Sequence, residues 1–202
     1  HRLLKLAEAH DIVVVEDDIF ADFETAPGPR LAAFDGLERV VHLASFSKTL
    51  SAAVRVGYVA ARPDWIEGLT DLKLATTFGS AEPSARLVHA LLTDGSYRRH
   101  VDGLRSRLAA VTGPVVRRLG AAGLTLWAPP AAGMFLWARL PEGLDSAAVS
   151  RAALAEGVLL APGDVFSVSR TAGRYLRFNV AQSSAPRVFE VLERAMAAGR
   201  AG

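Results

Sequence analysis

Three short apolar runs in the first third of the chain limit the folds that it can adopt. The runs DIVVVED (11–17), RVVHLASF (39–46) and RVGYVAA (55–61) are rich in β-branched residues and are too short for helices of that character. Continuous apolar runs of this kind are typical of strands that are buried on both faces of a sheet. A helix-like stretch, HRLLKLAEAHD, precedes them, so this region predicts part of an α/β sheet.

The remaining two thirds of the chain predict helices followed by a smaller α+β region. From Asp64, a possible helix cap, to about Leu119 the apolar periodicity is helical, with breaks at FGSAEPS and at Gly95. Four later segments have strand character: LTLWAPP, GMFLWARLP, VLLAPG and RYLRFNVA. Between and after them we expect a helix in DSAAVSRAALAEG and a closing helix from Ala185. The predicted domains are residues 1–115, with the main sheet, and residues 116–202.

Length and composition narrow the class of protein. The chain has 202 residues, half of them apolar, which is enough to bury a sizeable core. Its 23 basic and 21 acidic residues are scattered, which argues against direct binding of nucleic acid. It has no cysteine, no apolar run near the ~18 residues of a membrane span, and no secretory pattern, so we expect a cytoplasmic protein without membrane contact. Because the chain starts with His1 and not with methionine, we expect a fragment of a longer polypeptide.

Three acidic residues, Glu16, Asp17 and Asp18, follow the first apolar run. Ligands of open α/β sheets bind at the carboxyl ends of the strands, where these side chains are expected. A solvated turn, or a cap for the next segment, is an equally open interpretation. Paired carboxylates can also hold a divalent cation, but no histidine or further acid joins them at ligand spacing, so no metal site is predicted.

The segment ASFSKTL (44–50) places Lys48 just after the second predicted strand. Ser45 and Ser47 precede the lysine and Arg55 follows it, and hydroxyl groups with an arginine suit a phosphate monoester. A lysine amine can form a Schiff base with a carbonyl compound. Pyridoxal 5′-phosphate (PLP) has both an aldehyde and a phosphate, and a carboxylate would hold the proton on its ring nitrogen. The alternative is an ordinary solvated lysine in a turn.

Five motifs in order connect these segments to a known family. EDDIF, SFSKTLSAAVRVG, PPAAGMFLW, APGDVF and RYLRFNVA together resemble the C-terminal half of fold-type I PLP-dependent aminotransferases of class I/II. The resemblance is strongest to the aminotransferase-like domain of GntR-family, MocR-type transcription regulators and to aminoadipate-type aminotransferases. It implies an α/β fold: the end of the mainly parallel sheet of a large PLP-binding domain, with helices, followed by a small α+β C-terminal domain.

The resemblance also implies roles for residues near the second strand. Lys48 would form the internal aldimine with PLP and then move the proton between the substrate and the cofactor. Asp17 would pair with the pyridine nitrogen, in preference to Asp18. Ser45 and Arg55 would bind the phosphate, with Ser47 as a weaker candidate.

Two further positions bear on the substrate and on the chemistry. Arg177, in RFNV, matches the arginine that binds the substrate α-carboxylate, and Arg174 and Arg139 are the alternatives. Phe20 departs from the family pattern, because many members have a tyrosine there that donates a hydrogen bond to the cofactor, and phenylalanine cannot donate one.

Three functions are consistent with the sequence. The first is amino-group transfer between an amino acid and a 2-oxo acid through PLP. The second is effector sensing, in which an amine binds the same site and a DNA-binding domain outside this chain responds. The third is a structural or interaction module without PLP chemistry.

The resemblance also predicts a limit on the chain by itself. It implies a homodimer with shared active sites and a first half that supplies the rest of the pocket. We therefore expect the chain alone to bind PLP weakly and not to transaminate. We further expect its sheet to dimerise or swap, because an uncovered strand edge invites pairing.

Overall fold

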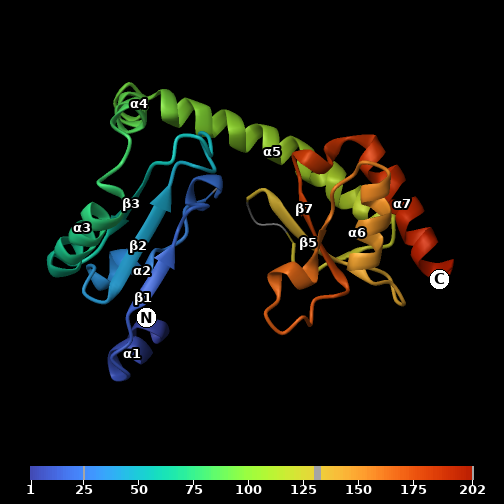
Figure 1. The fold of residues 1–202 in the computed structure, drawn as a ribbon, viewed down its shortest axis with the longest axis horizontal. Helices are drawn as coiled ribbons and strands as arrows, with labels where there is room; N and C mark the ends of the chain where they lie inside the picture. Colours follow the sequence, from blue (N-terminus) through green and yellow to red (C-terminus); the bar gives the residue numbers. More distant parts are fainter. Residues whose placement is uncertain (25, 130–132, 202) are drawn as a thin grey trace. The chain divides into compact units, whose positions relative to one another are not determined.

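The chain folds into two compact units. A computed structural model describes residues 1–24, 26–129 and 133–201 (Figure 1). Its contacts group residues 1–104 into the first unit and residues 105–202 into the second. Helix α5 (Ser96–Ala121) begins in the first unit and ends in the second. The domain boundary expected between residues 115 and 116 falls within this helix and stays a prediction.

The first unit contains a small sheet and several helices. Its elements in chain order are α1 (Arg2–Ala9), β1 (Val14–Asp17), η1 (Ala21–Phe23), α2 (Leu31–Asp35), β2 (Val40–Ser45), β3 (Gly57–Ala60), α3 (Pro63–Thr77), α4 (Glu82–Thr93) and the start of α5. Within the part of this unit that is described, the sheet has the order β1-β2-β3. Strands β1 and β2 are parallel and β3 is antiparallel to β2, and the three apolar runs are confirmed as strands.

The parallel pairing brings two polar segments to one end of this sheet. Asp17 is the last residue of β1 and pairs in register with Leu43 of β2. Ser45 ends β2 and pairs with Gly57, the first residue of β3. The carboxyl ends of β1 and β2 and the start of β3 therefore lie together, as Figure 1 shows for the two blue strands and the strand that follows them.

Burial of β1 differs from the expectation of a strand covered on both faces. The Val15 side chain is 60% exposed, and the neighbouring Val13 is 48% exposed. On β3, Tyr58 and Val59 are also exposed. Strand β1 is an edge strand, and the described residues of the unit leave its Val13 and Val15 uncovered, whereas α3 lies opposite Tyr58 and Val59 across a hollow and does not bury them.

The second unit is built around a four-stranded sheet, counted over its described residues, of order β4-β5-β7-β6. Its elements after α5 are β4 (Thr125–Leu126), β5 (Phe135–Arg139), α6 (Ser146–Ala155), β6 (Ala161–Pro162), η2 (Gly163–Phe166), β7 (Tyr175–Asn179), η3 (Gln182–Ser184) and α7 (Pro186–Ala201). The strand and helix segments expected beyond residue 120 are confirmed. Residues 130–132 of the PPAAGMFLW motif lie outside the described residues.

The core of the second unit lies between this sheet and two helices. Helices α6 and α7 pack side by side (Figure 1). Alternate residues of the central strands are buried, among them Leu136 and Ala138 on β5 and Leu176 and Phe178 on β7. The antiparallel register pairs Leu136 with Phe178 and Ala138 with Leu176. One face of the sheet is therefore apolar and buried, and the side chains of the remaining strand residues lie on the opposite face.

Two helix starts show how local sequence sets the boundaries. Asp145 is the N-cap of α6, and its carboxylate accepts a hydrogen bond from the Ala148 amide at 2.8 Å. Asp64, expected as a cap, instead lies in the first turn of α3, after Pro63. Proline takes the first helical position, so the N-cap is Arg62 and not Asp64. The Asp64 carboxylate forms an ion pair with the Arg62 guanidinium at 2.6 Å. No helix in the described ranges is both long and apolar enough to cross a membrane.

Candidate functional site

The three acids that follow the apolar part of β1 have three different surroundings. Glu16 caps α2, because its carboxylate oxygens accept the amides of Leu31 and Ala32 at 2.8 and 3.0 Å. The Asp18 carboxylate lies 2.6 Å from Arg30 Nε and 3.1 Å from His42 Nε2. One of the three acids is thus a helix cap, as the alternative interpretation of this segment allowed.

Asp17 is the acid that keeps most of its hydrogen-bonding capacity. Among the described residues its carboxylate accepts from the Ile19 amide, 3.3 Å from Oδ1, and its side chain is exposed at the end of β1. A carboxylate has about four acceptor positions. Asp17 can therefore accept a hydrogen bond from a ligand without breaking a contact of the fold, whereas Asp18 is already paired with Arg30 and His42 and is less exposed.

Lys48 lies in a tight turn directly after β2. The Leu50 amide donates to the Phe46 carbonyl at 2.8 Å, and the Phe46 amide donates to the Val56 carbonyl at 3.0 Å. These bonds fix the backbone on both sides of Lys48, while the side chain itself is exposed. Within the described part of the chain, no carboxylate forms an ion pair with its amine.

The side chains around Lys48 offer several hydrogen-bond donors. Ser45 Oγ accepts the Ser47 amide at 3.1 Å and lies 3.5 Å from the Val56 carbonyl. The Ser47 hydroxyl and the Arg55 guanidinium have no acceptor among the residues that the structure describes. Arg55 also has a left-handed backbone (φ 52°), a conformation that costs a residue with a side chain about 1–2 kcal/mol.

Gly57 allows the close strand pairing beside this turn. A Cβ atom at this position would lie 2.6 Å from the Ala44 carbonyl oxygen, which is closer than any side chain tolerates. Because Gly57 is in register with Ser45, the absence of a side chain lets β3 approach the end of β2 that carries Ser45.

Arg177 lies in the second unit, on the open face of its sheet. It is opposite Trp137 in the register of β5 and β7, and its guanidinium carbon lies 4.4 Å from the centre of the Phe135 ring and 4.0 Å from that of Phe166. No carboxylate in the described ranges forms an ion pair with it. A cation held between two rings keeps its hydrogen-bond donors for an anion.

A hollow of about 220 Å³ lies beside Arg177. Its lining includes Phe135, the segment 158–161, Phe178, Asn179 and Val188. Arg139 and Arg174, the alternative candidates, do not line it, and among the described residues neither guanidinium lies over an aromatic ring as that of Arg177 does. Of the three arginines, Arg177 alone combines a hollow and a fixed guanidinium, as far as the described residues show.

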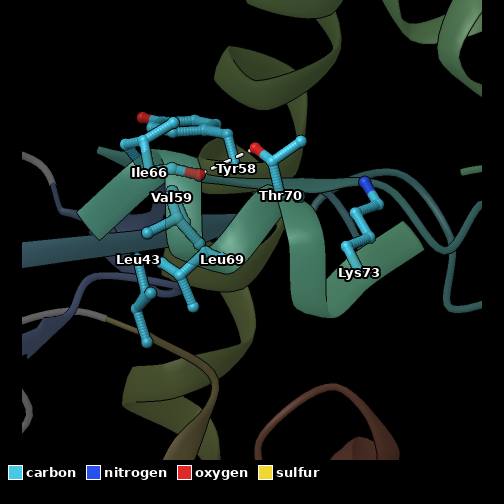
Figure 2. A pocket seen from close by; sticks show the side chains of 9 residues that line it. Leu43, Tyr58, Val59, Ile66, Leu69, Thr70 and Lys73 are labelled. Atoms are coloured by element: carbon cyan, nitrogen blue, oxygen red, sulfur yellow. Dashed lines mark hydrogen bonds between the residues drawn. The ribbon is translucent and has the colours of Figure 1, made fainter. Parts of the chain in front are cut away.

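A second hollow, of about 420 Å³, lies between the sheet of the first unit and α3 (Figure 2). Its lining is mostly apolar: Leu43, Ala44, Gly57, Tyr58, Val59, Ile66, Leu69, Thr70 and Lys73. The lysine here is Lys73, whose Nζ donates to Ser80 Oγ at 2.9 Å, and the Thr70 hydroxyl donates to the Ile66 carbonyl. None of the predicted cofactor residues lines this hollow.

Sequence reasoning missed a group of polar residues that contacts the Lys48 turn. Thr49 is buried; its hydroxyl lies 2.9 Å from the Tyr97 hydroxyl, and its carbonyl lies 2.7 Å from His100 Nε2. Tyr97 also donates to the Asp22 carboxylate. The run YRRHVDGLRSRL looks like a solvated basic helix face, and no local pattern distinguishes Tyr97 and His100 within it.

In the described residues, no group of three or more acidic or histidine side chains is arranged to hold a metal ion.

Comparison with known proteins identifies the family of the chain. The chain is 31% identical over 168 residues to the HTH-type transcriptional regulator NorG of Staphylococcus aureus. The aligned region covers 81% of this chain and 38% of NorG. The chain is 29% identical over 199 residues to aromatic-amino-acid aminotransferase 1 of Thermococcus litoralis, covering 96% of this chain and 47% of that enzyme.

A solved structure gives the same result at the level of the fold. The α-aminoadipate aminotransferase LysN of Thermus thermophilus, complexed with N-(5′-phosphopyridoxyl)-L-leucine, superposes with a TM-score of 0.88 at 28% identity, covering 99% of this chain and 54% of LysN. The chain thus spans about half, or less, of the length of these proteins. Residues 1–194 match the family described as aminotransferase class I and II, and the chain belongs to that family.

Proposed function

We propose that this chain binds PLP through Lys48 and forms part of an aminotransferase site that transfers an amino group between an amino acid and a 2-oxo acid. The observation that carries the proposal is the end of the β1-β2-β3 sheet. The segment that follows β2 carries the Lys48 amine, the Ser47 hydroxyl and the Arg55 guanidinium. These groups have no acceptor among the described residues, and Asp17 ends the neighbouring strand. This set of groups fits a ligand with an aldehyde, a phosphate and a protonated ring nitrogen.

PLP, when bound, supplies an aldehyde that condenses with amines and a ring that accepts electrons. The residues of the chain would bind and orient it. Ser45, Ser47 and Arg55 would donate to the phosphate oxygens, and Asp17 would hold the proton on the ring nitrogen. Lys48 Nζ would take up and return the proton of the reacting carbon, because it is a primary amine that no carboxylate of the described residues holds.

Arg177 is proposed to bind the carboxylate of the amino acid. The stacking of its guanidinium on Phe135 and Phe166 fixes the plane of the donors, which favours a two-pronged contact with a carboxylate. A titration with N-(5′-phosphopyridoxyl)-L-leucine would test this role. We expect the Arg177→Leu variant to bind it at least about tenfold more weakly than the wild type, since hydrogen bonds to charged groups are strong. The Arg139→Leu variant is the matched control and should bind normally.

The distribution of lysines makes the Lys48 proposal directly testable. The chain has three lysines, Lys5, Lys48 and Lys73, so each can be followed separately. The chain is incubated with PLP, reduced with borohydride and digested, and the phosphopyridoxyl group is located by mass spectrometry. We expect Lys48 to be labelled in preference to Lys5 and Lys73. Equal labelling of the three lysines would contradict the proposal.

The phosphate donors are tested by the same labelling with two reagents. Pyridoxal has the aldehyde but no phosphate, so it should label Lys48 with much less preference. Arg55→Leu should reduce the preference for Lys48 with PLP and leave labelling by pyridoxal unchanged. If PLP and pyridoxal give the same pattern in the wild type, the Arg55 turn does not bind a phosphate.

A second candidate function is effector sensing in a transcription regulator. The observation that favours it is the similarity to NorG, which is named an HTH-type transcriptional regulator. In that case an amine would occupy the same site, and a DNA-binding domain elsewhere in the protein would respond. A complete gene product with a helix-turn-helix domain before residue 1 would favour sensing. Steady transamination by the complete protein would favour the enzyme. The homodimer expected from the family also stays a proposal, to be measured by sedimentation.

A further inference from the structure

A polar cluster contacts the residue next to Lys48. Thr49 is 3% exposed, and its hydroxyl and its carbonyl have partners from helix α5. Its hydroxyl lies 2.9 Å from the Tyr97 hydroxyl, and its carbonyl oxygen lies 2.7 Å from His100 Nε2. The Tyr97 hydroxyl in turn donates to Asp22, from the 3-10 helix after β1. All of these residues belong to the first unit.

The chemistry of the groups fixes the direction of each bond. An ionised carboxylate only accepts, so Tyr97 donates to Asp22 and its oxygen accepts from the Thr49 hydroxyl. A carbonyl also only accepts, so His100 donates through its Nε2–H. Burial, together with the bond to Asp22, raises the pKa of the Tyr97 phenol. Tyr97 therefore stays protonated, as this arrangement requires.

Tyr97 also contacts the other side of the turn. Its ring meets the Phe46 ring edge-to-face, with centroids 5.5 Å apart and planes at 81°. Phe46 begins the turn, and its carbonyl accepts the Leu50 amide. One side chain from α5 thus contacts residues two before and one after Lys48, while the Lys48 side chain itself is exposed.

We propose that Tyr97 and His100, with Asp22 orienting Tyr97, are positioning residues that hold the Lys48 turn so that the amine stays at the end of β2. This inference deepens the proposed function and rests on it, because it names groups that act on the lysine without touching the cofactor. The anchors lie in sequence 48 and 51 residues beyond Thr49, so a helix holds the turn in addition to the backbone hydrogen bonds of the turn itself. A side chain fixed on a helix places a reactive group more reproducibly than a free loop does.

The test removes one hydroxyl and follows two separate readouts. Tyr97→Phe keeps the ring that packs on Phe46 but loses both hydroxyl contacts. The matched control is Tyr58→Phe, since the Tyr58 hydroxyl has no hydrogen bond among the described residues. The first readout is hydrogen exchange of the Leu50 amide in the chain without added cofactor. We expect Tyr97→Phe, which loses two hydrogen bonds, to speed it by at least about threefold to tenfold, the effect of losing a single one, and Tyr58→Phe to leave it unchanged.

The second readout is the share of PLP trapped by borohydride on Lys48, relative to Lys5 and Lys73 in the same molecule. We expect this share to fall in Tyr97→Phe and in His100→Leu, and to stay at the wild-type value in Tyr58→Phe. Circular dichroism confirms that each variant is folded. Unchanged Leu50 exchange in both Tyr97→Phe and His100→Leu would overturn the positioning role. So would faster exchange with an unchanged Lys48 share, where the wild type prefers Lys48.

The two readouts separate this inference from the proposed function. If wild-type Lys48 shows no preference for PLP but Tyr97→Phe still speeds Leu50 exchange, PLP binding fails and the anchoring of the turn by α5 stands. If Lys48 is strongly preferred in the wild type and in both variants alike, PLP binding stands and the positioning role fails.

Discussion

Strands β1 and β7 show how differently the two units use their sheets. On β7, Leu176 and Phe178 are 0% and 2% exposed, because α6 and α7 belong to the same unit and its core closes over this face. On β1, Val15 is 60% exposed, although it is as apolar as its counterparts. The second unit therefore has a complete core, and the first has the elements of a sheet without full cover. The predicted cofactor lysine lies in the less covered unit.

The largest expected difference comes from truncating matched side chains. Leu176→Ala removes a fully buried side chain and should lower the free energy of unfolding by about 2–5 kcal/mol. Val15→Ala, at an exposed position, should change it by about 0.5 kcal/mol or less. Urea denaturation of the chain, followed by circular dichroism, measures both. A large loss in Val15→Ala would mean that β1 is covered in solution.

Hydrogen exchange should show the same contrast without mutation. We expect the amides of β5 and β7 to exchange about tenfold to a hundredfold more slowly than those of β1 and β3, because local opening follows local burial.

The tryptophans give an independent check, since Trp65 is in the first unit while Trp127 and Trp137 are in the second. Variants that keep only Trp65 or only Trp137 should show the Trp65 signal changing at lower urea. Coincident transitions would show that the two units unfold together.

A smaller effect is expected from the helix caps, which also differ between the units. Asp145 caps α6 with its side chain, whereas Ala81, the N-cap of α4, provides no side-chain bond. Asp145→Ala should cost about 1 kcal/mol, and Asp145→Asn, which can still accept the Ala148 amide, should cost much less. The reciprocal change, Ala81→Asp, should stabilise the first unit by about 0.5–1 kcal/mol. Thermal unfolding of the three variants decides this, and a neutral Asp145→Ala would argue against the cap.

The smallest expected effect is the pH dependence from Glu24 in the first unit. The Gly28 amide, and then the Arg30 guanidinium, lower the pKa of this carboxyl below its ordinary value of 4.5. A carboxyl with a lowered pKa in the folded state contributes stability above its ordinary pKa and loses it as the pH falls through the lowered value. Glu24→Gln should therefore flatten the acid side of the stability profile below pH 4.5. Urea midpoints at a series of pH values measure this, with Glu38→Gln as the control.

Much of this architecture could be predicted from the sequence, because it depends on local patterns. The apolar runs that became β1, β2 and β3 and the later strands and helices follow from periodicity and from turn residues such as Gly157. The exposure of Val15 could not be predicted in this way, since a β-branched run describes the strand and not its neighbours. The family and fold were confirmed because five motifs occur in order.

The candidate site was less accessible to sequence reasoning. The motifs indicated Lys48, Asp17 and Arg55, whose proposed roles stay predictions. Sequence alone could not show that Glu16 caps α2 while Asp18 pairs with Arg30. The partner of Glu16 lies at least 15 residues away along the chain, and that of Asp18 at least 12. It also missed Tyr97 and His100, since contacts across about 50 residues leave no local pattern.

Gly57 has a consequence for the comparison of related sequences. Because any Cβ at this position meets the Ala44 carbonyl at 2.6 Å, a substitution must push β3 away from the end of β2. The turn that carries Lys48 is joined to that end, and Arg55 lies two positions before Gly57. A relative that keeps a lysine at position 48 but has a bulky residue at position 57 should therefore have lost the geometry of the turn. Position 57 thus offers a simple marker for sorting relatives that retain the site from those that keep only its lysine.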